Sequence, residues 1–456
     1  MRMRMMMLWL CFLTSVALNV FLLAYQNRNH EQKHGWSRRA AEEAEAVAAF
    51  NCSGHGRAYL DGDGPVCECN QCYEGPHCSF LNFSHRCVVD AYSGDPMYLE
   101  PFWMRKQNAE SSAVVIAGWH RMSYFFQDLS YISPQLVLHI RRLHSLVNNA
   151  VVHSKHIVLG TGSTQLISAA VFALSIRDNL SSPAQVVATA PYYPVYETQT
   201  DYFRTARFEF GGEASSLNKA SGDVIEVVTS PNNPDAQLMN RVLTGPNVKA
   251  VYDRAYYWPH YTAIPAPADE DLMLFTLSKV TGHAGSRLGW AIVKDKQVSE
   301  NMKQYIKLAE IGSSKETQLR ALQLIKSFLR QGDGKQIFRF AYETMSNRWE
   351  KLGKIMSSSK RFSIQQIPPQ FCIFSDRVRE ASPAYAWVKC EREEDRDCCA
   401  VLRAANIVGR AGSLFGSDDR YVRLSLLKIQ DDFDLLLRRL SILVSQEQGG
   451  SRADSM

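Results

Sequence analysis

Short apolar runs alternate with amphipathic stretches over most of the chain beyond residue 150. Helical patterns with apolar positions three or four residues apart separate most of these runs. Alternation of short buried strands with helices predicts an α/β fold with a mainly parallel sheet. Each predicted strand ends in Gly, Pro, Ser or Asp or is followed by one of them. The predicted strands are HIVLG (156–160), VVATA (186–190), IEVVTSP (225–231), VKAVYD (248–253) and LMLFTLS (272–278).

Polar residues that could bind a ligand or take part in a reaction come directly after several of these strands. A glycine-rich stretch, Gly160 to Gln165, opens a helix after the first strand, and the free N–H groups of such a helix start suit a phosphate. Asp253 ends one strand and Lys279 comes after another. Because ligands of such sheets bind at the carboxyl ends of the strands, we expect these residues to share one site.

A different pattern opens the chain, where Leu8 to Tyr25 is apolar almost throughout. As a helix it would span about 27 Å, close to the thickness of the hydrocarbon core of a bilayer. The small residues around Ala17 leave a cleaved signal peptide as an alternative, but a cut there would interrupt the apolar run. Arg2 and Arg4 favour a cytosolic N-terminus. We therefore expect a signal anchor, with the body of the chain on the lumenal or extracellular side in the secretory pathway. Arg28, on the far side of the span, weakens the charge bias that favours this orientation.

A cysteine-rich stretch supports the lumenal side. It has too few apolar residues for a core, so disulfides are its expected source of stability. Zinc binding by the Cys69-x-x-Cys72 pair would need a second matching pair, and we expect no metal. Glycosylation sequons at Asn51, Asn82 and Asn179 fit a secretory route. The six cysteines of the stretch are Cys52, Cys67, Cys69, Cys72, Cys78 and Cys87.

Composition excludes two classes of protein. With 46% hydrophobic and 21% charged residues the chain is an ordinary globular protein rather than a disordered one. The 51 Lys and Arg against 46 Asp and Glu leave a net charge of only +5, without the dense basic stripe of a nucleic-acid-binding protein.

The most specific motif is LSKVTGHAGSRLGW, from Leu277 to Trp290. Lys279 at a strand end can reach an aldehyde, while Arg287 can clamp a phosphate with two hydrogen bonds. Here the chain resembles the alliinase and tryptophan-aminotransferase-related family of plants, within the fold-type I superfamily that uses pyridoxal 5′-phosphate. The cysteine-rich stretch resembles the epidermal-growth-factor-like (EGF-like) domain of alliinase, and the resemblance covers about Asn51 to Leu440.

The resemblance implies an α/β fold-type I transferase with a mainly parallel sheet in a large domain. A smaller α+β C-terminal domain and a small disulfide-rich EGF-like module complete it. We expect a cytosolic tail (1–7), a transmembrane anchor (8–25), a stalk (26–50), the EGF-like module (51–88), the large cofactor-binding domain (89–335) and the small domain (336–445).

The resemblance also implies roles for individual residues. Lys279 would form the Schiff base with the cofactor and act as general base, and Asp253 would pair with the pyridine nitrogen. Asn233 and Tyr256 would reach the phenolic oxygen, and Tyr193 would stack on the ring. The substrate carboxylate would bind Arg423, with Gly94 nearby. The phosphate would bind Ser163, Thr164, Ser278 and Arg287, together with Tyr124 from the neighbouring subunit of a homodimer.

One segment departs from the family pattern, because Ala236 stands where many fold-type I enzymes have the Gly of Asn-Pro-x-Gly. The turn after Asn233 must therefore form without that Gly. For the cysteines the resemblance implies four bridges, with Cys372 and Cys399 unpaired. The implied pairs are Cys52–Cys67, Cys69–Cys78, Cys72–Cys87 and Cys390–Cys398, although the module's spacing alone allows fifteen connectivities.

Three functions are compatible with these residues. The first is an aminotransferase that acts on an L-amino acid, with tryptophan or another aromatic residue as a candidate, and with a 2-oxo acid as acceptor. The second is a carbon–sulfur lyase that cleaves cysteine sulfoxides, and the third is an inactive membrane-tethered binding protein. Both reactions remove the α-proton with the same Lys and Asp, so the catalytic residues do not separate them. We favour transamination, because GRAGSLFGSDDRYVRLS and the Lys279 motif resemble the aminotransferase-related branch.

Overall fold

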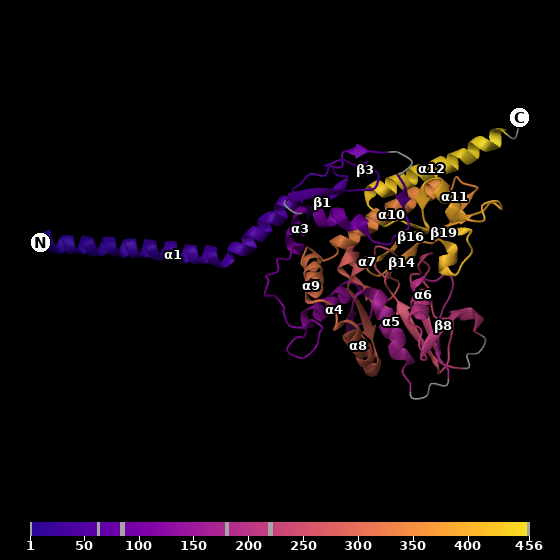
Figure 1. Cartoon of the computed structure of the whole chain (residues 1–456), viewed down its shortest axis with the longest axis horizontal. Helices are drawn as coiled ribbons and strands as arrows, with labels where there is room; N and C mark the ends of the chain where they lie inside the picture. The colour runs from indigo at the N-terminus through magenta and orange to yellow at the C-terminus, as the bar shows by residue number, and fades with distance from the viewer. Residues whose placement is uncertain (1, 62–63, 83–86, 178–181, 218–221, 454–456) are drawn as a thin grey trace. The chain divides into compact units, whose positions relative to one another are not determined.

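The computed structural model describes residues 2–61, 64–82, 87–177, 182–217 and 222–453. The chain forms two compact units (Figure 1). One comprises residues 1–82 with 115–120, and the other comprises residues 83–114 with 121–456.

The first unit begins with a single long helix, α1 (Arg2–Ala48). Its apolar part, Met5–Tyr25, has a mean hydropathy of 2.2, and none of it is buried against other residues. By length and composition this part can cross a membrane, and a signal sequence has the same pattern. The apolar part therefore starts three residues before the predicted span, and α1 continues through most of the predicted stalk.

The cysteine-rich module comes after α1 and is built on two small hairpins. Strand β1 (Gly56–Asp61) pairs antiparallel with β2 (Gly64–Cys69), and β3 (Tyr73–Glu74) pairs with β4 (Phe80–Leu81). Two predicted bridges, Cys52–Cys67 and Cys69–Cys78, are confirmed. Cys72 and Cys87 are each disulfide-bonded, and their mutual pairing stays a prediction. Since Cys52 and Cys78 are among the few buried side chains here, disulfides take the place of an apolar core.

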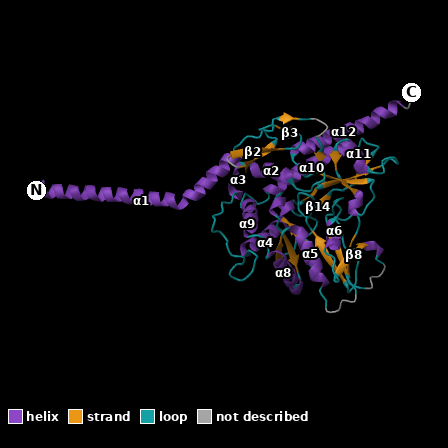
Figure 2. Cartoon of the chain, viewed as in Figure 1, coloured by secondary structure: helices purple, strands orange, loops and turns teal. Residues whose placement is uncertain are grey.

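A seven-stranded sheet is the centre of the second unit (Figure 2), and it confirms the predicted mainly parallel sheet. Its order is β6-β12-β11-β10-β9-β7-β8, and all neighbours are parallel except β12, which is antiparallel to β11 and β6. Helices α5 (Gly162–Ser175) and α8 (Lys296–Glu310) pack against it. The strands are β6 (His156–Gly160), β7 (Ala184–Ala188), β8 (Phe208–Glu213), β9 (Val224–Thr229), β10 (Val248–Asp253), β11 (Leu272–Thr276) and β12 (Gly289–Val293).

A buried histidine links the sheet to its covering helices. His144 receives a hydrogen bond from the indole of Trp290 at Nε2 (2.9 Å), so its proton is on Nδ1, which donates to Asn149 (2.8 Å). Burial lowers the pKa of His144 to about 4, so the ring is neutral as this network requires.

His144 lies on α4 (Pro134–Val147). The other helices that the structure describes in the second unit between residues 100 and 356, in addition to α5 and α8, are α2 (Glu100–Met104), α3 (Lys106–Ser112), α6 (Val195–Tyr202), α7 (Leu277–Thr281), α9 (Lys315–Leu329) and α10 (Gln336–Met356).

A second, four-stranded antiparallel sheet has the order β13-β16-β19-β18. Its strands are β13 (Phe362–Ile364), β16 (Tyr385–Cys390), β18 (Arg410–Ala411) and β19 (Tyr421–Ser425). The remaining elements are β5 (Val89–Asp90), β14 (Gln370–Cys372), β15 (Arg377–Arg379), β17 (Ile407–Val408), α11 (Cys398–Ala404), α12 (Gln430–Ala453) and the 3₁₀ turns Met97–Leu99, Ala214–Ser216, Ala284–Ser286 and Gly412–Phe415.

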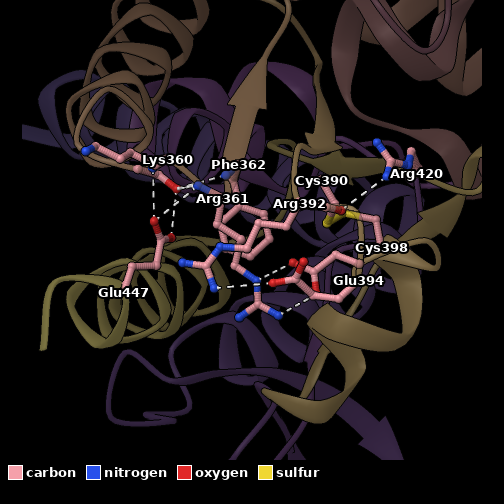
Figure 3. A network of polar contacts seen from close by, with 11 residues as sticks. Lys360, Arg361, Phe362, Cys390, Arg392, Glu394, Cys398, Arg420 and Glu447 are labelled. Atoms are coloured by element: carbon pink, nitrogen blue, oxygen red, sulfur yellow. Dashed lines mark hydrogen bonds and ion pairs between the residues drawn. A yellow bond between two sulfur atoms is a disulfide. The ribbon is translucent and has the colours of Figure 1, made fainter. Parts of the chain in front are cut away.

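Ion pairs and a disulfide hold the charged loop between β16 and α11 (Figure 3). The predicted Cys390–Cys398 bridge closes this loop, and the predicted free thiols, Cys372 and Cys399, are buried. Within the loop Asp395 accepts two hydrogen bonds from Arg361 (2.5 and 2.7 Å), which lower the pKa of the Asp395 carboxyl. Glu447 of α12 accepts from the backbone N–H of Arg361 (3.2 Å), so the loop, β13 and α12 are fixed to one another.

Candidate active site

The carboxyl edge of the seven-stranded sheet collects the residues that the sequence singled out. The glycine-rich turn comes after β6, Asn233 lies just beyond β9, Asp253 ends β10, and Lys279 comes after β11. Strand β12 runs in the opposite direction, so a residue shortly before its start, Arg287, reaches the same edge. Because β12 starts at the edge where the parallel strands end, the residues before it, including Arg287, lie at the same edge as Asp253 and Lys279.

The four-stranded sheet supplies the other wall of the site. Tyr385 starts β16, Arg410 starts β18, and Arg423 lies in the middle of β19. The two walls enclose a cavity of about 180 Å³, lined by Gly94, Ser163, Tyr193, Thr229, Asn233, Asp253, Ala255, Tyr256, Lys279, Tyr385, Arg410 and Arg423.

Lys279 lies in the lining of this cavity and is half-buried. Its Nζ donates a hydrogen bond to the carbonyl oxygen of Gly94 and lies 5.3 Å from the centre of the Tyr256 ring. Burial lowers the pKa of Lys279, and the positive charge of Arg423 lowers it further. An amine with a lowered pKa is more often neutral, and the neutral form is the nucleophile and the base.

Asp253 is a buried carboxylate, 4% exposed. Burial raises its pKa, while hydrogen bonds from the Tyr196 hydroxyl (2.8 Å) and the Ala255 N–H (3.0 Å) oppose that rise. Since the Tyr196 hydroxyl donates to Asp253, it accepts from Thr229 (2.6 Å). A cation placed against Asp253 in the cavity would favour its charged form.

The glycine-rich turn and Arg287 form a cradle. Gly162 has a φ of +81°, and a Cβ there would lie 2.6 Å from Nη2 of Arg287. The Arg287 guanidinium therefore lies over the start of α5, where backbone N–H groups point outward. Ser278 is buried beside this turn and accepts a hydrogen bond from Thr276 (3.1 Å).

Arg423 is 2% exposed, although it is a full positive charge. Its Nη1 donates to Oδ1 of Asn233 (3.0 Å) and its Nη2 to the carbonyl of Tyr92 (2.6 Å). The Tyr385 ring lies 3.9 Å from its Cζ, and its Nε has no hydrogen-bond partner among the described residues. A buried guanidinium in the lining of a cavity can bind an anion that enters it.

Most of the predicted site residues come together, but one does not. Thr164 and the cradle residues Ser278 and Arg287 lie beside the cavity rather than in its lining. Tyr124 is 71% exposed and contributes nothing to the cavity of its own chain. Eight predicted residues line the cavity, namely Gly94, Ser163, Tyr193, Asn233, Asp253, Tyr256, Lys279 and Arg423. Their roles stay predictions.

The turn after Asn233 forms without its family glycine. Ala236 adopts the left-handed conformation with a φ of +62°, and its N–H donates to the carbonyl of Asn232 (3.0 Å). The Asp235 carboxylate accepts from Asn232 (3.0 Å) and from the N–H of Gln237 (3.2 Å). These hydrogen bonds offset a strain of about 1 kcal/mol for a residue with a Cβ in this region.

The sequence did not single out Tyr385, Arg410 or Tyr196. The Tyr385 hydroxyl forms a short hydrogen bond with that of Tyr256. Burial alone would raise the pKa of Tyr385, but the charges of Arg423 and Lys279 lower it below its ordinary value. All three lie within stretches that resemble the family, but nothing in the sequence marks them as site residues. Tyr196 ends APYYPVY, Tyr385 is the second residue of AYAWVKCEREEDRDC, and Arg410 is the second residue of GRAGSLFGSDDRYVRLS.

The chain matches two family models over most of its length. A model described as "Allinase" matches residues 89–444, and one described as "Alliinase EGF-like domain" matches residues 35–87. Among the relatives, "Tryptophan aminotransferase-related protein 4" of Arabidopsis thaliana is 53% identical and the match covers 91% of each chain. "Alliin lyase 1" of Allium sativum is 44% identical, with 93% of this chain and 90% of the relative covered.

Solved structures of aminotransferases share the fold. The aspartate aminotransferase of Rhizobium meliloti superposes with a TM-score of 0.56 at 17% identity, covering 78% of this chain and 90% of that one. A double mutant of the Thermus thermophilus aspartate aminotransferase superposes with a TM-score of 0.56 at 15% identity, covering 78% and 91%.

The glycine turn gives a direct stability prediction. We expect Gly162→Ala to lower the free energy of unfolding by about 1–2 kcal/mol, because the new Cβ meets both a left-handed φ and the Arg287 guanidinium. Gly285→Ala is the matched control, since nothing lies within 4 Å of its Cβ position and its φ is ordinary. Denaturant unfolding of both variants measures the difference, and equal stabilities would contradict the cradle.

Proposed function

This chain belongs to the alliinase family, and we propose that within it the protein is an aminotransferase that converts an L-amino acid to its 2-oxo acid. The observation that carries the choice of reaction is the 53% identity to Tryptophan aminotransferase-related proteins 3 and 4 of Arabidopsis thaliana, against 43–45% for the alliin lyases of Allium. The proteins named Tryptophan aminotransferase-related protein 2, of Arabidopsis thaliana and Oryza sativa, are 40–41% identical to this chain. Tryptophan or another aromatic amino acid is the candidate amino donor.

Enzymes of this family and of this fold use pyridoxal 5′-phosphate, and the residues of the cavity fit it. The cradle of Gly162, Ser163 and Arg287 suits a phosphate dianion, and a Cβ at Gly162 would displace its arginine. The buried Asp253 suits the pyridine nitrogen, because burial raises the pKa of this carboxyl and a protonated ring beside it would favour its charged form. Lys279, with its lowered pKa, suits the aldehyde.

When bound, the cofactor supplies a conjugated ring that withdraws electrons from the substrate Cα. The protein's own residues do the rest. Arg423 would bind the substrate α-carboxylate, and this would fix the orientation of the Cα–H bond. Lys279, once released from the aldehyde, would take the α-proton at Nζ, and burial keeps this amine free to accept it. Tyr193 and Tyr256 would keep water from the reacting face.

A carbon–sulfur lyase of the alliinase type is the second candidate. It is favoured by the EGF-like module and by identities of 43–45% with alliin lyases over more than nine-tenths of the chain. Lyase and transaminase share the removal of the α-proton and differ only in the later steps, so the proposed roles of Lys279 and Asp253 are the same in both.

The reaction is decided by products. The cofactor-loaded protein should form a 2-oxo acid stoichiometric with a new amino acid, and no pyruvate and ammonia from a cysteine sulfoxide. The Lys279→Ala protein should have no turnover. Borohydride treatment should attach the cofactor covalently to the Lys279 peptide of the wild-type protein and to no corresponding peptide of this variant. Asp253→Asn should retain the cofactor and lose at least about a hundredfold in kcat, because the ring loses its cationic partner. Release of pyruvate and ammonia as the main reaction would refute transamination.

We also propose a homodimer in which Tyr124 completes the neighbouring site. The support is an exposed apolar loop that includes Met122 (84% exposed), Tyr124 (71%) and Leu129 (78%), which would be unusual on a monomer. In the dimer the Tyr124 hydroxyl would reach the partner's phosphate.

Complementation tests the shared site. Tyr124→Ala and Lys279→Ala should each be inactive, but co-expressed they should regain about a quarter of the wild-type activity, since each mixed dimer has one intact site. Lys279→Ala with Asp253→Asn is the control and should regain none, because both residues act in their own subunit. Recovery by neither pair, with the Tyr124→Ala protein active by itself, would remove Tyr124 from the site.

Finally, we propose that the protein is a single-pass membrane protein with its catalytic body on the lumenal or extracellular side. The apolar Met5–Tyr25 helix and the disulfide-rich module support a place in the secretory pathway. Of the predicted glycosylation sites, Asn51 and Asn82 are exposed, and Asn179 lies outside the described residues.

The topology predicts three outcomes in intact microsomes. The body should resist added protease, shift in size after treatment with an N-glycosidase, and stay in the membrane pellet through a carbonate wash. Release by carbonate would mean that the apolar segment is cleaved, whereas digestion in sealed vesicles would reverse the orientation.

A further inference from the structure

Two arginines face each other across neighbouring strands in the wall of the cavity. Arg410 of β18 is the direct partner of Arg423 of β19 in the antiparallel register. Residues opposite each other on such strands project from the same face of the sheet. Both side chains accordingly line the cavity that also contains Lys279.

The pair is electrostatically unfavourable by itself. Like charges opposite each other on adjacent strands are destabilising, and each would gain from a carboxylate nearby. Within the part of the chain that the structure describes, Arg423 is held by the amide of Asn233 and the carbonyl of Tyr92, both neutral. Arg410 lies over the ring of Tyr92, with 4.4 Å from Cζ to the ring centre, and its buried Nε has no hydrogen-bond partner there.

The charge of Arg410 is directed into the cavity. Burial raises the pKa of the Tyr193 hydroxyl, and Arg410 and Arg423 both oppose that rise, so Arg410 lies within electrostatic reach of this cavity-lining ring. Arg410 acts on the Tyr385 hydroxyl in the same direction. The substrate side of the cavity therefore holds two guanidinium groups, while a single α-carboxylate requires one.

We propose that Arg410 binds a second carboxylate, so that the site accepts dicarboxylic 2-oxo acids and amino acids in one of its two half-reactions. The inference rests on the proposed function, because a transaminase must take both its donor and its acceptor at one site. Tyr92 organises the pair: its carbonyl orients Arg423 and its ring supports Arg410, which fixes the spacing between the two cationic groups. Arg410 is then a specificity residue, and Arg423 binds the carboxylate that every substrate shares.

The test uses unreactive probes. Glutarate carries two carboxylates, butyrate carries one, and neither has the amino or oxo group needed for reaction. Each probe is titrated into the cofactor-loaded full-length protein, and binding is monitored by calorimetry and by the visible absorbance of the bound cofactor. Glutarate should bind at least about tenfold more tightly than butyrate. Arg410→Gln should abolish this ratio with butyrate affinity retained, and Arg410→Lys should restore part of it. Arg377→Gln, an exposed arginine on β15, is the matched control and should keep the ratio.

Each outcome supports or overturns the second anion site. If Arg410→Gln weakened the binding of glutarate and of butyrate equally, Arg410 would bind the carboxylate that all substrates share, and the proposal would be overturned. A wild-type protein that binds glutarate no more tightly than butyrate would also overturn it. A wild-type protein that prefers glutarate but releases pyruvate and ammonia from a cysteine sulfoxide would refute transamination and leave the second anion site standing. Transamination without the preference would refute the second site alone.

Discussion

The carboxylate of Asp253 is buried in a place where its charge has a high desolvation cost, and the geometry of the site depends on meeting that cost. The ends of β9 and β10 and helix α6 contribute the groups that do so, with the Tyr196 hydroxyl held in turn by Thr229. Burial raises the pKa of the Asp253 carboxyl, while these hydrogen bonds and the positive charges of Lys279 and Arg254 oppose that rise. A further cation that enters with a ligand would favour the charged form of the carboxyl. In the proposed function, the fold supplies the buried carboxylate of an ion pair, and the ring nitrogen of the cofactor would supply the cation.

The sequence predicted the sheet and the edge where the chemistry lies, because both depend on local patterns. Buried strands show as apolar runs, and residues at their ends, such as Asp253 and Lys279, meet at one edge in any parallel sheet. The antiparallel direction of β12 could not be derived this way, since it depends on the pairing of strands distant in the chain. The motif from Leu277 to Trp290 indicated Arg287, and the resemblance to a family supplied Arg423.

Tyr385 and Arg410 show what the sequence could not indicate. Each stands at the start of a short strand, and each reaches the cavity only because the four-stranded sheet faces the larger one. The turn at Ala236 is a different case, because the sequence showed that it must form without Gly, and only the structure shows that hydrogen bonds to Asp235 stabilise the turn. Contacts between sheets are properties of the tertiary structure, and a single sequence gives no signal for them.

The division of the cavity between two sheets has an evolutionary consequence. The residues proposed for bond breaking lie at the ends of strands of the parallel sheet, whereas the arginines proposed to contact the substrate lie on β18 and β19. Mutations in the four-stranded sheet can therefore change which substrates bind, while the residues proposed for bond breaking stay unchanged. Such a separation lets a lineage acquire new metabolic roles through few substitutions. It gives a physical route by which relatives named as aminotransferase-related proteins and as alliin lyases diverged from one scaffold while remaining 40–53% identical to this chain.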